Sequence, residues 1–154
     1  MKLLPFTFLI LALGFFQNTE AQSNKRTQNA NLTNSVAIDG YDPVAYFTQG
    51  KAIKGESKYA VNANGVVYYC SSAANKSLLE KDFSKYEPQY GGWCAYAMGS
   101  TGEKVEIDPE TFKVVNGKLF LFYNAYFNNT LNSWNKDEYN LKLKADENWK
   151  KYNQ

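Results

Sequence analysis

The residues best suited to chemistry lie in one short stretch, 88–99, which combines glycines, aromatic rings and sulfur. The sulfur atoms belong to Cys94 and Met98, which stand four positions apart in the chain. That spacing places both side chains on one face of a helix or a strand. Thiolate and thioether groups are the soft ligands that copper(I) prefers. The stretch therefore predicts the functional site, with soft-metal binding as its first candidate chemistry.

A third sulfur, that of Cys70, follows a predicted strand and leaves three alternatives open. Together with Cys94 and Met98 it would complete a three-sulfur site for copper(I). A disulfide between Cys70 and Cys94, the usual pairing in an exported chain with two cysteines, would remove that site. Such a bond would stabilise the fold by roughly 3 kcal/mol in the chain-entropy model. In the third alternative both cysteines are small buried hydrophobic residues that never meet.

The same stretch also suits the recognition of a small or extended ligand. Tyr90, Trp93 and Tyr96 carry large rings that could line a groove. Gly91 and Gly92 lie between them, and glycine lets the backbone approach a ligand closely. Aromatic residues at this density are also typical of the core of a small domain. The sequence thus predicts either a ligand-binding groove or a structural core here.

The absence of histidine removes most catalytic possibilities, because no Ser-His-Asp triad, Cys-His dyad or histidine-based metal site can form. The chain also lacks a Cys-x-x-Cys motif and a phosphate-binding glycine loop. Paired carboxylates, such as Asp39 with Asp42 and Asp108 with Glu110, occur beside turn residues, where capping is their usual role. We therefore expect a non-enzymatic protein.

The first 21 residues are typical of a secretory signal peptide. Lys2 precedes an apolar run over 3–16, and Ala21 ends a suitable cleavage site. We expect a secreted or periplasmic protein with no stable membrane association after cleavage. The formal net charge of +2 is too small to predict binding to nucleic acid. Residues 22–35 are polar and predict a flexible lead, and residues 36–152 form the predicted domain.

Turn signals and periodicity predict the elements of this domain. Asn64-Gly65 and Asn116-Gly117 each lie between runs of β-forming residues and indicate two hairpins. One helix is predicted after Asp42-Pro43, and another is predicted to be capped by Ser71 or Ser72. A strand is predicted over 103–107, helical structure from 125 to 134, and an amphipathic helix near the C terminus. The result is an α+β fold, a small single domain with two β-hairpins packed against about three helices.

Three blocks of sequence resemble the secreted YHS-domain family. They are 38–47 (IDGYDPVAYF), 68–75 (YYCSSAAN), and Tyr86 with 88–95 (PQYGGWCA), and the resemblance covers 36–149. It implies a compact α+β fold, export, and a role related to copper or other heavy metals. This chain departs from the family pattern at Cys70, where similar chains carry an aromatic residue. It also has no histidine, so it cannot form a histidine-dependent metal site.

Overall fold

A four-stranded sheet forms one half of the fold in the computed structural model, which describes residues 24–153. Its strands lie in the order β1 (Leu32–Thr33), β2 (Val36–Ala37), β4 (Val66–Cys70) and β3 (Glu56–Ala63). β3 and β4 form the first predicted hairpin, with the turn at Asn64-Gly65. The predicted signal peptide lies outside the described residues.

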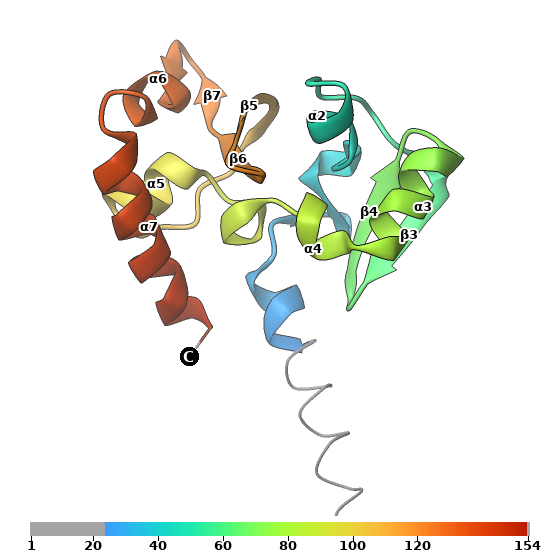
Figure 1. The fold of residues 1–154 in the computed structure, drawn as a ribbon. Helices are drawn as coiled ribbons and strands as arrows, with labels where there is room; N and C mark the ends of the chain where they lie inside the picture. Colours follow the sequence, from blue (N-terminus) through green and yellow to red (C-terminus); the bar gives the residue numbers. More distant parts are fainter. Residues whose placement is uncertain (1–23, 154) are drawn as a thin grey trace, which may run out of the picture.

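Three short helices flank this sheet: α2 (Ala45–Thr48), α3 (Ala73–Lys81) and α4 (Phe83–Tyr86). α3 begins after Ser72, whose hydroxyl accepts the backbone N–H of Asn75 as the predicted N-cap should. Figure 1 shows α3 beside the hairpin of β3 and β4. The sheet and these helices enclose the first hydrophobic cluster. Its buried members include Ile38, Val44, Tyr46, Tyr68, Cys70, Leu79 and Leu121.

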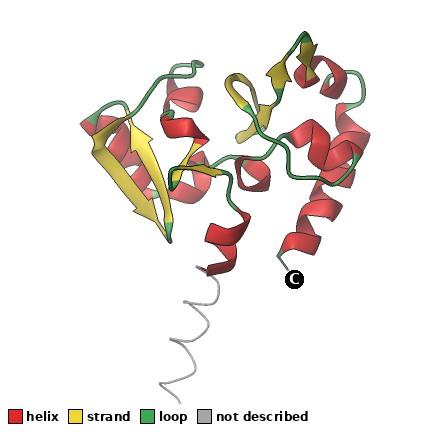
Figure 2. Cartoon of the chain, turned by 180° about the vertical axis from the view of Figure 1, so that it is seen from behind, coloured by secondary structure: helices red, strands yellow, loops and turns green. Residues whose placement is uncertain are grey.

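The other half of the fold combines a second hairpin with three helices (Figure 2). The hairpin pairs β5 (Asp108–Val115) with β6 (Lys118–Phe122), as predicted from Asn116-Gly117. The helices are α5 (Ala95–Ser100), α6 (Thr130–Trp134) and the amphipathic α7 (Glu138–Tyr152). They enclose a second hydrophobic cluster, formed by Tyr90, Ala95, Met98, Phe120, Phe122, Trp134 and Ala145. The predicted α+β fold, with a C-terminal helix, is therefore confirmed.

Asp42 is a completely buried carboxylate that joins two segments of the first half. Its Oδ1 accepts the N–H of Val44 at 2.8 Å. Its Oδ2 accepts the N–H and the hydroxyl of Ser71 at 2.7 and 2.6 Å, and the side-chain amide of Asn75 at 2.6 Å. A buried charge is tolerated only when donors surround it in this way. Asp42 thus links the start of α2 to the junction between β4 and α3.

The predicted flexible lead is instead folded in its described part. Residues 24–29 are helical, and β1 pairs antiparallel with β2. The composition of this segment is too polar to form a core of its own, but it does not need one, because it packs on the rest of the chain. Ala30 and Leu32 contact the first hydrophobic cluster.

Two other local predictions are wrong. Residues 103–107 form an extended connection without strand pairing, although the carbonyl of Val105 accepts the N–H of Cys94. Tyr126 and Phe127, expected on a helix, form the turn between β7 (Asn124–Ala125) and β8 (Asn128–Asn129). Helical spacing of apolar residues misled here because these two rings pack against nothing.

Replacing Asp42 by asparagine should lower the free energy of unfolding by about 2–4 kcal/mol, because an amide NH₂ then faces hydrogen-bond donors in a buried site. Urea denaturation at neutral pH measures this loss. Asp39→Asn is the matched control: Asp39 is exposed and accepts one side-chain hydrogen bond, from Thr33, so we expect a change within about 0.5 kcal/mol. Equal effects of the two substitutions would contradict the role of Asp42.

Candidate functional site

The stretch that carries the predicted site begins with a short helical turn, η2 (Gln89–Gly92). Three consecutive residues in it have left-handed backbone conformations: Tyr90, Gly91 and Gly92, with φ of 55°, 62° and 88°. Glycine adopts this conformation without strain, whereas a bulky residue such as Tyr90 does so only when its surroundings hold it there. The turn ends with the N–H of Trp93 donating to the carbonyl of Tyr90 at 3.1 Å.

This turn holds the N-terminal segment in place. The N–H of Asn31 donates to the carbonyl of Gly91 at 2.8 Å, and its side-chain amide donates to the carbonyl of Gly92 at 3.3 Å. The indole Nε1 of Trp93 donates to the carbonyl of Asn29 at 2.7 Å. The two glycines and Trp93 therefore form a clasp for residues 29–31, a role that the sequence did not indicate.

Gly91 is required for a close approach as well as for its backbone conformation. A Cβ atom at this position would lie 2.8 Å from the ring of Trp149 and 2.9 Å from the carbonyl oxygen of Asn29. Both distances are shorter than real Cβ contacts allow. The absence of a side chain at Gly91 thus lets the N-terminal segment and α7 meet at one point.

An open groove of about 1120 Å³ lies beside this point. Helical segment 24–29, the chain from Glu87 to Gly91, and α7 all contribute to its walls. Four aromatic rings line it: Tyr68, Phe83, Tyr90 and Trp149. Five charged side chains line it as well: Lys25, Arg26, Glu87, Asp146 and Lys150. Aromatic rings with a few polar groups are typical of ligand sites.

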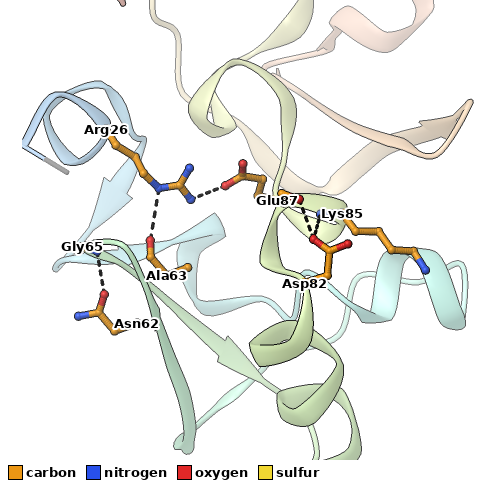
Figure 3. A network of polar contacts seen from close by, with 8 residues as sticks. Arg26, Asn62, Ala63, Gly65, Asp82, Lys85 and Glu87 are labelled. Atoms are coloured by element: carbon orange, nitrogen blue, oxygen red, sulfur yellow. Dashed lines mark hydrogen bonds and ion pairs between the residues drawn. The ribbon is translucent and has the colours of Figure 1, made fainter. Parts of the chain in front are cut away.

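Arg26 and Glu87 form a half-buried ion pair on one wall of the groove (Figure 3). The guanidinium group of Arg26 also donates from Nε to the carbonyl of Ala63 at 3.3 Å and lies 5.1 Å from the ring centroid of Phe83. Burial by itself lowers the pKa of Arg26, but the hydrogen bond and charge of Glu87 outweigh burial and raise that pKa. The arginine therefore stays charged beside the aromatic wall.

Tyr90 and Asp146 form the polar contact of the opposite wall. The hydroxyl of Tyr90 donates to Oδ1 of Asp146 at 2.9 Å, and Oδ2 of Asp146 accepts the ammonium group of Lys142 at 2.7 Å. Burial, then the hydrogen bond and charge of Asp146, raise the pKa of Tyr90 far above its ordinary value. Tyr90 is thus a neutral, fixed ring, and its edge meets the ring of Trp149.

The predicted ligand-binding residues separate into three groups. Tyr90 and Gly91 line the groove, whereas Gly92 and Trp93 serve the clasp on residues 29–31. Tyr96 lines a second, shallower hollow of about 330 Å³. Two lining residues were not among the predicted site residues: Arg26 lies in the predicted flexible lead, and Trp149 lies in the predicted C-terminal amphipathic helix. Neither residue stands in a motif, so its position in the fold is the first sign of its role.

The three sulfurs lie in different surroundings. Cys70 is buried in the first hydrophobic cluster, where burial and then the charge of Asp42 raise the pKa of its thiol to about 12. Met98 is buried in the second cluster, among aromatic rings. Cys94 is also buried; its Sγ accepts the N–H of Tyr123 at 3.3 Å and lies 3.4 Å from Oγ1 of Thr130.

Both cysteines are free thiols, so the disulfide alternative is wrong. The two thiols do not pair because they lie in different halves of the fold: Cys70 ends β4 in one half, and Cys94 precedes α5 in the other. Within residues 24–153, no group of three or more cysteine, aspartate or glutamate side chains is placed to hold a metal ion. A three-sulfur site would need Cys70 to leave the first cluster.

The chain shows no significant match to a family model, to a curated protein or to a solved structure. Over residues 24–153, none of the helices has the length and apolar character needed to cross a bilayer.

Gly91→Ala should lower the free energy of unfolding by about 2–4 kcal/mol, because it adds overlap with Trp149 and Asn29 to the strain of a left-handed residue. Gly50→Ala is the matched control, since Gly50 has nearly the same φ, 63°, with no atom near its missing Cβ. The control should lose only about 1 kcal/mol. Chemical denaturation measures both values, and limited proteolysis should cut residues 24–31 faster in Gly91→Ala alone. Equal losses would show that the close approach is unimportant.

Proposed function

We propose that this chain is an exported, non-enzymatic, YHS-like recognition module that binds a small ring-bearing molecule with an acidic group in the groove beside Tyr90 and Trp149. The observation that carries this proposal is the meeting of four aromatic rings and a surplus of positive charge in one concave surface. Aromatic walls supply apolar contact area to a ring, and a few charged groups fix its orientation.

The sign of the charge selects the ligand. Three cations, Lys25, Arg26 and Lys150, line the groove against two carboxylates, Glu87 and Asp146, so the balance is +1 by subtraction. Both carboxylates are already engaged: Glu87 pairs with Arg26, and Asp146 accepts from Tyr90 and Lys142. The carboxylates that would repel an acidic ligand are therefore neutralised by these contacts.

Lys150 is the cation best placed to meet an acidic group. It is exposed near the end of α7, and it forms no ion pair among the residues that the structure describes. It follows Trp149 directly, so one α7 turn presents a ring and an ammonium group to the groove. Arg26, by contrast, is held by Glu87 and Ala63 and shapes the opposite wall.

The fluorescent aromatic anion 8-anilinonaphthalene-1-sulfonate provides a test, because it combines rings with one acidic group. Lys150→Glu should weaken its binding about fivefold, as expected for reversing one charge at a solvated surface. Lys144→Glu, on the same helix and exposed but outside the groove, should bind the dye as the unmodified protein does. Fluorescence titration gives both affinities, and circular dichroism verifies that the variants are folded.

Competition then defines the ligand class. Benzoate, indole-3-acetate and phenyl phosphate should displace the dye, whereas benzyl alcohol, which has the ring without the acid, should compete at least tenfold more weakly. The proposal is refuted if Lys150→Glu leaves dye binding unchanged. It is also refuted if benzyl alcohol displaces the dye as well as the aromatic acids do.

Copper(I) binding by Cys94 and Met98 is a second candidate function, favoured by the hollow that Cys94 lines together with Tyr96, Tyr123 and Thr130. The buried thiol borders the hollow on that side, and thiolate with thioether suits copper(I). Competition for copper(I) with bicinchoninate measures the affinity. Cys94→Ala should lose binding at least tenfold, and Cys70→Ala, whose thiol lies in the first cluster, should retain it. Retention by Cys94→Ala would remove this candidate.

A further inference from the structure

Two aromatic side chains project from the tip of the hairpin formed by β7 and β8. Asn124 pairs with Asn129 and Ala125 with Asn128, so Tyr126 and Phe127 are the two residues of the turn. Their exposures are 92% and 112%, which exceed those of the other large apolar side chains of the described chain. Two neighbouring rings that bury nothing within their own fold stabilise it little. Any contact that these two rings stabilise must therefore lie outside the fold.

The turn is built against the conformational preference of its residues. Both have positive φ, 51° for Tyr126 and 64° for Phe127, as a type I′ turn requires. The other three hairpins of the described residues have positive φ at both turn positions as well, but with smaller residues, Asn34-Ser35, Asn64-Gly65 and Asn116-Gly117. Bulky residues in left-handed conformations carry strain, and strain of this kind is concentrated at functional positions. The exposed rings are thus retained at a cost to stability.

The hairpin that carries the tip has no charged residue, although the carboxylate of Asp108 lies at its base, where Oδ2 accepts from the side-chain amide of Asn124 at 3.4 Å. From Leu119 to Asn135 the sequence contains no Asp, Glu, Lys or Arg. The strands below the rings present amide side chains, those of Asn124 and Asn128, both exposed. Figure 1 shows β7 at the end of the molecule away from helical segment 24–29 and from the C terminus. The tip therefore lies apart from the groove, which helical segment 24–29 helps to line.

We propose that Tyr126 and Phe127 insert into the interfacial layer of an electrically neutral lipid bilayer. The tip is convex, and a bilayer interface deforms around two projecting rings, whereas a rigid protein partner would need a matching pocket. Aromatic rings are favoured at the level of the lipid headgroups. The hairpin itself has no charged side chain, so a shallow insertion of the two rings takes no charged group of the hairpin out of water.

The predicted contact is shallow and reversible. Two rings without a basic patch provide one weak signal, and stable anchoring takes two. This agrees with the expectation that the exported chain has no stable membrane association. The contact would hold the molecule at a membrane surface with the groove facing away from the lipid, and it does not depend on what the groove binds.

Flotation with phosphatidylcholine vesicles tests the inference. The double variant Tyr126→Asn/Phe127→Gly gives the turn its preferred residues, so it should raise the thermal midpoint by a few degrees. The same variant should lose at least tenfold in vesicle partitioning. Tyr139→Ser and Leu143→Ser are matched controls, because they remove exposed apolar side chains from α7 and should partition like the unmodified chain.

Two further readouts make the result decisive. In a Phe127→Trp variant, brominated phosphatidylcholine should quench an emission that neutral vesicles shift to the blue. Binding should also be unchanged between about 50 and 500 mM salt, since it does not rest on charge. The inference is overturned if the unmodified chain does not bind vesicles at millimolar lipid, if the double variant binds equally, or if binding requires anionic lipid and disappears in salt.

Discussion

A single buried carboxylate, that of Asp42, sets the arrangement of the first half of the molecule. Four hydrogen bonds from Val44, Ser71 and Asn75 converge on its two oxygens, and its side chain is completely shielded from water. A buried charge deprived of any of these donors would be strongly unfavourable. The segment before α2 and the junction from β4 to α3 must therefore unfold as one unit. Cys70 lies at the same junction, which explains why its thiol is buried beside a negative charge rather than available to a partner.

The turn from Tyr90 to Gly92 has the corresponding role for the second half. Its left-handed backbone aims two carbonyl groups at Asn31, and the missing side chain of Gly91 admits Trp149. Helical segment 24–29 and α7, which are far apart in the sequence, meet at this turn as a result. The groove lies beside that meeting point, and its walls come from both helices together with β4 and the chain from Glu87 to Gly91. Structural and functional readings of the glycine-rich stretch are thus compatible: the same backbone that closes the fold also shapes the site.

Aromatic residues have three separate uses in this chain, and exposure distinguishes them. Phe120, Phe122 and Trp134 are fully buried and form the second cluster. Tyr90 and Trp149 are fixed by packing but border the groove, so they can offer one edge to a ligand. The rings at the tip of the β7–β8 hairpin are held only by the turn itself. The aromatic residues are therefore divided among the core, the lining of the groove and the exposed tip of the β7–β8 hairpin.

The sequence by itself determined the local elements wherever one residue type has one dominant effect. Asn-Gly pairs located two hairpins, the Ser71-Ser72 pair located the start of α3 to within one residue, and the lack of histidine removed whole classes of chemistry. Each of these depends on near neighbours or on composition alone. Only the tertiary structure decided the rest. Whether Cys70 meets Cys94, whether the polar lead folds, and whether Arg26 reaches Glu87 all depend on contacts between distant segments. Periodicity failed at Tyr126 and Phe127 for a related reason: apolar spacing predicts burial only when another surface is present to receive the side chains.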